Sequence, residues 1–243
     1  MEAFFAADVI DIEVLADNAL IALNYQQAVK HGLKYILAGT NIATEGVDIP
    51  STWNWHKADK RNIVAISRRF GGPRLKTFPS ISTFGMMRYA ALHRILWVSF
   101  LDYLSYRKYE ALETLERDFG YKAYPYKHYE NVFTRFYQGY LQPNKFGVDK
   151  RKPHLSSLIM SGEITRDEAL EQAAGIAYPS EKDMEADRLY FLKKMGWSEE
   201  KFEAYMRRPE KRHDEYPSEY AFYNKLLGLY RRFGLRAGRI TWN

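Results

Sequence analysis

The sequence predicts an α/β fold in its amino-terminal third, followed by a mostly α-helical region. Three observations support this class. Apolar residues recur at three- and four-residue steps from Ile12 to Leu23, which predicts a helix that ends at Gly32. Residues 34–38 (KYILA) then form an apolar run of strand length. Beyond Thr83 the apolar spacing becomes mostly helical.

A loop of small and polar residues, 39–50 (GTNIATEGVDIP), follows the predicted strand. In open α/β sheets, ligands bind at the carboxyl ends of strands, where helix amino termini offer unpaired N–H groups. Gly39 allows close approach of a ligand to the backbone. Thr40 and Asn41 can donate hydrogen bonds to a nucleotide, and Glu45 can hold a magnesium ion. Taken alone, an ordinary turn with an Asx cap is the better explanation of these residues.

The middle of the chain is expected to contain one more strand and two helices. Residues 62–66 are predicted to form a short second strand. Residues 89–106 are predicted to form a buried helix. Leucines and a phenylalanine between residues 101 and 119 mark a long helix that stops at Gly120.

Helix-capping residues predict the starts of later helices. Thr165 and Glu168 form a capping-box pair, because each side chain can bind an orphan amide at the helix start. Ser180 and Ser198 stand where two further helices begin. A last helix is expected after Ser218.

Composition excludes several classes of protein. The chain has 243 residues, of which 46% are apolar, so it can bury a core and is not globally disordered. It has no cysteine, which excludes disulfide scaffolds, zinc ribbons and cysteine nucleophiles. There is no Walker loop and no G-x-G-x-x-G motif, and the histidines lack neighbours at metal-ligand spacing.

The sequence gives no sign of export or of a membrane span. The first ten residues lack the pattern of a signal peptide. His93, Arg94 and Asp102 interrupt the most apolar stretch before it reaches the ~20 residues that a span requires. We therefore expect a cytoplasmic protein without a membrane partner. The formal net charge of +6 favours anionic partners without identifying them.

The densest polar constellation lies at residues 129–157. Its basic and hydroxyl side chains fall within about a dozen positions: Lys145, Lys150, Arg151, Lys152, His154, Ser156 and Ser157. Pro143, Gly147 and Pro153 keep the segment from being one regular helix. Such a loop can surround an anion, and arginine adds bidentate geometry for phosphate or carboxylate. A solvated basic loop is an equally supported alternative, although Asp149 and the flanking apolar residues favour a partly buried network.

Three stretches resemble the N-acetyl sugar amidotransferase family of surface-polysaccharide biosynthesis, a branch of the PP-loop ATP pyrophosphatases. They are KYILAGTNIATEGVDIPSTW, RRFGGPRLKTFP and KHYENVFTRFYQGYLQPNKFGVDKRKPHLSSLIMSGEITRDEAL. The resemblance covers most of residues 5–175. Family members also have a cysteine-containing segment and an S-G-G-x-D-S phosphate loop, and neither is present in this sequence.

The resemblance implies a fold and three regions. The fold is a partial Rossmann-like sheet of the PP-loop, adenine nucleotide α-hydrolase-like type, followed by a mostly helical carboxyl-terminal region. Residues 1–85 would form an incomplete nucleotide domain. Residues 86–178 would form a helical region with the basic loop, and residues 179–243 a helical extension.

The resemblance also implies a reaction and its partners. The acetamido group of a sugar becomes an acetamidino group during the synthesis of lipopolysaccharide O-antigen or another surface glycan. ATP, with Mg²⁺, would activate the amide oxygen before ammonia displaces it. Ammonia would come from glutamine through glutaminase and ammonia-channel subunits similar to those of histidine biosynthesis. The substrate would be a nucleotide-linked sugar or a nonulosonic acid.

Positions carried over from the family give the expected site. The residues on the nucleotide side are Gly39, Thr40, Asn41 and Glu45. The expected catalytic residues are Lys150, Arg151 and His154, with His154 the least unsuitable proton acceptor. The expected substrate-binding residues are Lys76, Arg135, Lys145, Asp149 and Ser156. The assignment requires the segment around Asp149 to meet the loop that follows Ala38.

Two other functions stay open at this point. The chain can be a non-catalytic half that works only when a separate polypeptide supplies the phosphate loop. It can also be a basic RNA-binding module, in which some of its 19 tyrosines stack on bases. Nucleic acid is the less favoured partner, because the basic residues concentrate in one compact segment.

Overall fold

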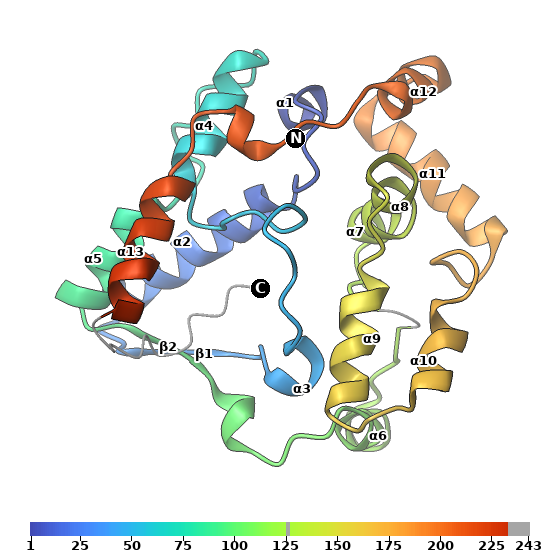
Figure 1. Cartoon of the computed structure of the whole chain (residues 1–243), viewed down its shortest axis with the longest axis horizontal. Helices are drawn as coiled ribbons and strands as arrows, with labels where there is room; N and C mark the ends of the chain where they lie inside the picture. Colours follow the sequence, from blue (N-terminus) through green and yellow to red (C-terminus); the bar gives the residue numbers. More distant parts are fainter. Residues whose placement is uncertain (125–126, 233–243) are drawn as a thin grey trace. The chain divides into compact units, whose positions relative to one another are not determined.

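The computed structural model describes residues 1–124 and 127–232 (Figure 1). The chain divides into two compact units. Unit 1 contains Met1–Ala38, Pro50–Ser99 and the described residues from Pro209 onward, and unit 2 contains Gly39–Ile49 and Phe100–Arg208. Each unit therefore combines segments that are distant in sequence. The expected boundaries after residues 85 and 178 are not the boundaries of these units.

Unit 1 has a small parallel sheet and several helices. The strands are β1 (Tyr35–Ala38) and β2 (Leu96–Ser99), and their register pairs Tyr35 with Leu96. The described helices of this unit are α1 (Glu2–Ala6), α2 (Val14–Lys30), α4 (Lys60–Arg69), α5 (Thr83–Leu92), a 3₁₀ turn at His213–Glu215 and α13 (Tyr220–Arg232). The described chain thus has an α/β unit, but a two-stranded sheet does not establish the expected Rossmann-like PP-loop sheet.

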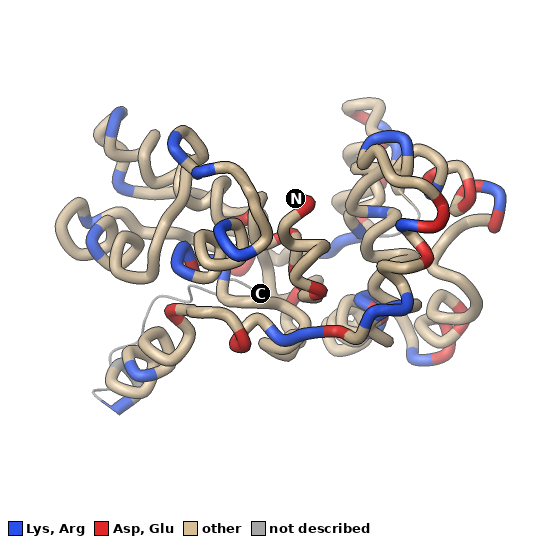
Figure 2. The backbone as a smooth tube through the Cα atoms, turned by 90° about the horizontal axis from the view of Figure 1, so that it is seen from above, with Lys and Arg blue, Asp and Glu red and all other residues tan. Residues whose placement is uncertain are grey.

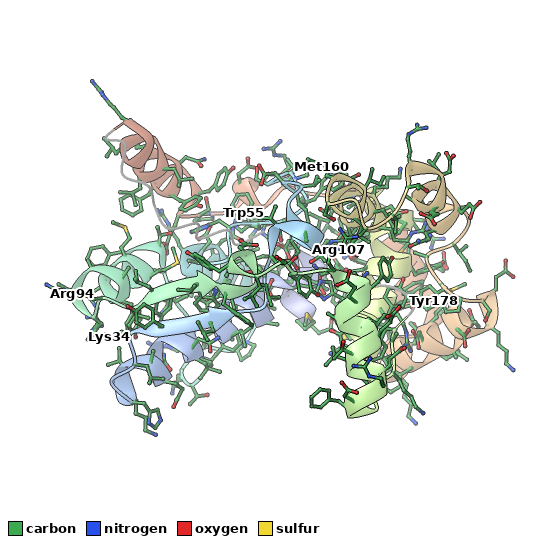
Figure 3. All side chains as sticks on the ribbon, turned by 90° about the horizontal axis from the view of Figure 1, so that it is seen from below. Lys34, Trp55, Arg94, Arg107, Met160 and Tyr178 are labelled. Carbon is green, nitrogen blue, oxygen red and sulfur yellow. The ribbon has the colours of Figure 1, made fainter. Side chains whose placement is uncertain are left out.

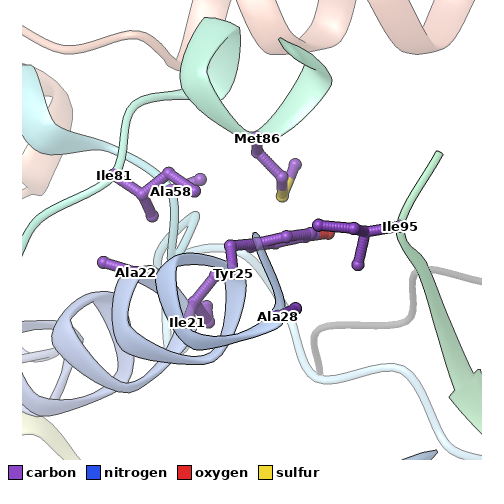
Figure 4. Close-up of a cluster of buried hydrophobic side chains, with 8 residues drawn as sticks. All are labelled: Ile21, Ala22, Tyr25, Ala28, Ala58, Ile81, Met86 and Ile95. Carbon is purple, nitrogen blue, oxygen red and sulfur yellow. The ribbon is translucent and has the colours of Figure 1, made fainter. Parts of the chain in front are cut away.

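The core of unit 1 is built around Tyr25 of α2. Its side chain extends toward Ile95, with Met86 above it in Figure 4. The Tyr25 ring also stacks on Tyr89 with a centroid distance of 5.1 Å. Burial raises the pKa of the Tyr25 hydroxyl to about 12. Ile36 packs against the same cluster, so one face of the sheet is covered by α2 and α5.

A buried polar network joins distant segments of unit 1. The carboxylate of Asp11 accepts hydrogen bonds from Lys57 Nζ at 2.7 Å and from the backbone N–H of Trp55 at 2.6 Å. Asp11 raises the pKa of the buried Lys57 ammonium against the lowering effect of burial. His213 packs on Trp55 with a ring-centroid distance of 5.0 Å, and its Nδ1 lies 2.8 Å from Oδ1 of Asn62. Because every member has a partner, the network can be buried at acceptable cost.

Unit 2 is helical in its described part. Its elements are α3 (Ile42–Glu45), a 3₁₀ turn at Phe100–Tyr103, α6 (Lys108–Phe119), α7 (Val132–Phe136), a π-helical turn at Tyr137–Leu141, α8 (Gln142–Phe146), α9 (Arg151–Met160), α10 (Arg166–Ala173), α11 (Glu181–Met195) and α12 (Glu199–Arg207). Phe136, Phe191 and Phe202 pack together at its centre. Arg107, labelled in Figure 3, precedes α6 and pairs with the buried Glu163 at 3.2 Å.

Two predicted elements of the middle region are wrong. Residues 62–66 lie in helix α4, because Asp59 caps its start and the buried Ile63 and Ile66 stand three residues apart on one face. Residues 89–106 are not one helix. Helix α5 ends at Leu92, and residues 96–99 form β2 because they pair with β1. The long helix expected from residue 101 begins only at Lys108.

Other predicted elements are confirmed. Helix α2 ends before Gly32, which adopts φ +66°, and β1 covers most of the predicted first strand. Leu23, the last apolar residue of the predicted repeat, is exposed, whereas Ile21 and Tyr25 of α2 are buried. The expected caps are all formed at the starts of α10, α11 and α12 by Thr165, Ser180 and Ser198. Helix α13 lies where the last helix was expected, and residues 233–243 are outside the described residues.

Among the described helices, none combines the length and the apolar character that crossing a membrane demands.

Candidate functional site

The loop that follows β1 is held by an asparagine cap. Asn41 Oδ1 accepts a hydrogen bond from the Thr44 N–H at 2.9 Å, and Asn41 Nδ2 donates to the Gly39 carbonyl at 3.2 Å. The Ile42 N–H donates to Asp102 Oδ1 at 2.7 Å. Both polar atoms of the Asn41 amide are therefore engaged in shaping α3, as an Asx cap predicts.

Helix α3 packs against α9 within unit 2 (Figure 1). Ser157 of α9 accepts a hydrogen bond from the Val47 N–H at 3.2 Å and donates to the Pro153 carbonyl at 3.0 Å. This bond ties the segment Gly39–Ile49 to the helix whose first turn contains Arg151 and His154. Residues about 110 positions apart are thereby brought together.

A cavity of about 570 Å³ lies between these segments and the residues around α6 and α7. The size is within the usual range of small-molecule sites. Seven of its lining residues were expected from the sequence: Gly39, Asn41, Glu45, Asp149, Lys150, Arg151 and His154. Further lining residues were not expected: Tyr106, Lys108, Tyr109, Tyr121, Tyr124, Lys127, His128, Glu130 and Gln138. The segment around Asp149 and the loop after Ala38 thus face one space.

Two ion pairs neutralise part of the cavity wall. Lys127 pairs with Glu45. Arg151 pairs with both carboxylate oxygens of Asp149, at 2.8 Å for its NH2 group, and the same group donates to the Gly175 carbonyl at 3.1 Å. Arg151 therefore holds the segment after α10 in place, and Glu45 already has a cationic partner.

His154 is neutral at physiological pH. Its pKa is lowered to about 3, mainly by burial and in addition by the nearby charges of Lys127, His128 and Lys150, and a hydrogen bond with the Thr44 backbone acts in the opposite direction. Its ring meets that of His128 edge to face at a centroid distance of 6.1 Å. A group with so low a pKa is a weak proton acceptor. The neutral imidazole of His154 therefore suits hydrogen bonding to a ligand better than general base catalysis.

One wall of the cavity is aromatic. Tyr106, Tyr109, Tyr121 and Tyr124 line it, and the rings of Tyr121 and Tyr124 meet edge to face at 6.3 Å. Lys108 reaches the same wall, with its ammonium 5.3 Å from the centre of the Tyr109 ring. Tyrosine faces and ammonium groups together suit a ligand with a ring and an anionic group.

Several expected site residues do not line this cavity. Arg135 instead forms a bidentate ion pair with the buried Asp187, at 2.5 and 2.7 Å. The Lys145 ammonium donates to the carbonyls of Tyr205 and Arg208 at 2.7 Å each. Both cations therefore stabilise the packing of α11 and α12 on the helices that carry them.

The remaining three expected residues also lie elsewhere. Ser156 donates to the Lys152 carbonyl on its own helix at 2.8 Å, and its neighbour Ser157 is the serine that contacts the 39–49 segment. Thr40 is half-buried and is absent from the cavity lining. Lys76 is exposed and belongs to unit 1.

The residues that the sequence did not indicate carry weak local signals. Lys127 and His128 open the longest stretch of the family resemblance, but no spacing distinguishes them from surface residues. His128 has φ +66°, a left-handed conformation that only the structure reveals. Lys108 stands at the start of a helix, and in the sequence nothing distinguishes it from an ordinary solvent-exposed lysine.

The site does not present a preformed metal centre. Within residues 1–124 and 127–232, no group of three histidines and carboxylates is placed to hold a metal ion. Asn41 is committed to the cap of α3 and Glu45 to Lys127. These residues do not fit a triphosphate with its magnesium ion, because they offer neither a free carboxylate pair nor a glycine-rich cradle of N–H groups.

A family model matches part of the chain. Residues 130–227 match the family model of the C-terminal domain of WbpG-like LPS biosynthesis proteins. The matched range includes Asp149, Lys150 and His154 of the cavity, and it excludes the 39–49 segment. No curated protein and no solved structure matches the chain. The match supports a place in lipopolysaccharide biosynthesis.

Proposed function

We propose that the chain acts as an ATP-dependent N-acetyl sugar amidotransferase of lipopolysaccharide O-antigen or other surface-glycan biosynthesis, with the cavity of unit 2 as its sugar-binding site. The proposed reaction converts an acetamido sugar to an acetamidino sugar with glutamine-derived ammonia. One observation carries the proposal. Residues 39–45 and 149–154, which come from two separate stretches of the family resemblance, line the same cavity. The match of residues 130–227 to an LPS biosynthesis domain supports the pathway.

The cavity residues would bind and orient an anionic sugar. Lys108 and Lys150 offer ammonium groups to a phosphate or a sugar carboxylate. The tyrosine wall offers flat faces for the sugar or base ring. Holding the sugar in one orientation would supply much of the rate enhancement, because an amide carbon reacts only when its attacker is well aligned.

Exclusion of water would be the second contribution of the cavity. Ammonia must reach the amide carbon before water does and in its unprotonated form, which favours a partly enclosed site. ATP, when bound, would activate the amide oxygen so that it can leave when ammonia attacks the carbon. Because the donor set of this cavity does not fit a triphosphate, we derive no step on the nucleotide from these residues.

Reconstitution tests the proposed function. The chain is combined with the glutaminase and ammonia-channel subunits, glutamine, ATP, Mg²⁺ and an N-acetyl sugar nucleotide, and mass spectrometry follows replacement of the acetamido oxygen by NH. Lys150→Ala is expected to lower product formation roughly tenfold or more, since a charge-assisted hydrogen bond contributes about 1.5–3 kcal/mol. Lys152→Ala is the matched control, because Lys152 is exposed and does not line the cavity. Equal product from both variants would refute the role of Lys150.

A second candidate is a half-enzyme that works only with a separate polypeptide bearing the phosphate loop. One face of the parallel sheet favours it. Tyr35, Leu37 and Leu96 share that face and are 63%, 66% and 54% exposed. Parallel sheets are normally covered on both faces, so this face suits a further α/β layer. Calorimetric titration with ATP and Mg²⁺ separates the two candidates. Binding of ATP by the chain alone favours the complete enzyme, whereas the absence of binding favours the half-enzyme.

The RNA-binding alternative ranks below these two. Residues 60–99 contain eight lysines and arginines and no acidic residue, whereas both signs are interspersed in the described segments before and after them (Figure 2). Non-specific binding to a nucleic acid relies on an extended stripe of cations, and this basic stretch belongs to unit 1 whereas the cavity belongs to unit 2. A gel-shift assay with tRNA at several salt concentrations checks this ranking.

A further inference from the structure

Lys108 is an unusual cation in the cavity of unit 2. It is the first residue of α6, its side chain is half-buried, and it lines the cavity. Across the part of the chain that the structure describes, its ammonium makes no ion pair or hydrogen bond, and its contact is the face of the Tyr109 ring. A partly desolvated ammonium without an anionic partner is costly. Such a group points to a missing counter-charge.

Two other cations that line the cavity have anionic partners among the described residues, unlike Lys108. Lys127 and Arg151, which line the same cavity, are paired with Glu45 and Asp149. Burial and the charge of Lys127 together lower the pKa of Lys108. The charge of Lys127 therefore acts against the charged form of Lys108 although Lys127 is paired with Glu45, and an incoming anion beside Lys108 would offset this repulsion.

Glu163 is the acidic residue whose charge acts on Lys108, and it has other partners. Glu163 influences the charge of Lys108, but its two carboxylate oxygens face other groups. Oε1 lies 3.2 Å from Arg107 Nε, and Oε2 lies 3.5 Å from the Tyr109 N–H. Glu163 thus stabilises the start of α6 and leaves the ammonium of Lys108 to the cavity.

The surroundings of Lys108 indicate what the anion is attached to. Tyr106 and Tyr109 flank it in sequence, and Tyr121 and Tyr124 line the same cavity. Tyrosine rings pack against the apolar faces of sugars and bases, and their hydroxyl groups bind polar edges. The ligand that matches this wall has an oxyanion joined to a ring.

We propose that Lys108 is the specificity-determining residue of the cavity and binds the oxyanion of the substrate, a phosphate or a sugar carboxylate, while the attached ring packs on the tyrosines. This proposal rests on the proposed function only for the identity of the substrate as a sugar. It adds a residue to which neither the sequence pattern nor the family resemblance pointed. An uncharged or amine-bearing sugar would leave Lys108 without a partner and would bind weakly.

Binding measurements on the full chain test this role. Calorimetric titrations use inorganic pyrophosphate as the phosphate probe and glucuronate as the carboxylate probe. Lys108→Met is expected to weaken binding of the preferred probe roughly 10- to 100-fold, as loss of a charge-assisted bond predicts. Lys108→Arg should retain most of the affinity. Lys122→Met is the matched control, because this exposed lysine lies between lining residues and does not itself line the cavity.

The outcomes distinguish a phosphate from a carboxylate as the bound anion, and they distinguish failure of the Lys108 proposal from failure of the proposed reaction. Binding of pyrophosphate alone identifies a phosphate, and binding of glucuronate alone identifies a carboxylate. Failure of the wild-type chain to bind either probe, or equal affinity in Lys108→Met, would overturn the role of Lys108. If Lys108→Met loses binding but the reconstituted wild-type mixture makes no acetamidino sugar, the anion site stands and the proposed reaction fails.

Chemical labelling provides a readout that does not depend on the affinity of a variant. Acetic anhydride acetylates unprotonated amines, so a lysine with a lowered pKa reacts at a pH where ordinary lysines are still protonated. Mass spectrometry is expected to show that the bound probe protects Lys108 and leaves Lys122 unchanged. Labelling of Lys108 that is unaffected by a probe that binds would contradict the proposal.

Discussion

Gly139 is the position at which a single methyl group should disturb the cavity without changing its chemistry. It lies in the π-helical turn Tyr137–Leu141. A Cβ at this position would meet Tyr129 Oη at 2.6 Å, Tyr178 Cε2 at 2.8 Å and the Ala177 carbonyl at 2.9 Å. All three distances are shorter than ordinary van der Waals contact, so Gly139→Ala requires the neighbours to move.

Those neighbours are held in place. The Tyr129 hydroxyl donates to the Ala177 carbonyl, and the Tyr178 hydroxyl donates to Asp187 at 3.0 Å. Overpacking of such a site costs about 1–3 kcal/mol, and we take the upper half because a backbone atom is among the contacts. Alanine regains about 1 kcal/mol over glycine through its helix propensity. The expected net loss of unfolding free energy is therefore about 1–2 kcal/mol.

Thermal and urea unfolding measure this loss. For a chain of this size, the melting temperature should fall by roughly 2–8 °C. Because Tyr129 and Ala177 line the cavity, binding of the anion probe should weaken as well. Gly228→Ala is the matched control, since a Cβ at that helical glycine meets nothing within 4 Å and should stabilise by about 0.5–1 kcal/mol. A Gly139→Ala protein as stable as Gly228→Ala would refute the reasoning.

Two further predictions concern buried charges and buried histidines. Asp187→Asn should lower the unfolding free energy by about 3 kcal/mol, because Arg135 keeps its charge and loses its bidentate partner. If urea unfolding shows a loss under about 1 kcal/mol, this ion pair does not stabilise the fold as proposed. Burial lowers the pKa of His56 to about 4, of His154 to about 3 and of His213 to about 4, against an ordinary value of 6.5. Below pH 6.5 the unfolded chain therefore binds more protons than the folded chain. The unfolding free energy keeps its maximum contribution from these histidines above that pH and decreases as the pH falls toward 4. The slope is up to about 4 kcal/mol per pH unit if all three histidines contribute. Urea unfolding at a series of pH values checks this, and a flat profile from about pH 6.5 to 5 would contradict it.

Local signals in the sequence were enough for several helix ends and for the first strand. Thr165, Ser180 and Ser198 cap helices as expected, because a capping side chain bonds an amide only a few residues away. Gly32 and Gly147 end helices in the left-handed conformation for the same local reason. Nothing distant in the chain is needed to form these bonds.

Elements that depend on distant partners could not be predicted in this way. Residues 96–99 form a strand because β1, some 60 positions earlier, pairs with them. The branched residues at 62–66 favour a strand by local propensity, but burial of Ile63 and Ile66 on one face of α4 decides for a helix. In both cases the free energy of tertiary packing exceeded the local preference.

For the candidate site as well, some features could be predicted from the sequence and others depended on the tertiary structure. The sequence by itself indicated the two segments that meet, 39–45 and 149–154, because each concentrates polar residues beside glycine or proline. Only the tertiary structure decided that Arg135 and Lys145 serve packing, that Lys127 neutralises Glu45, and that Lys108 faces the cavity. A side chain's type states which bonds it can make, whereas its partner depends on which distant segment folds against it.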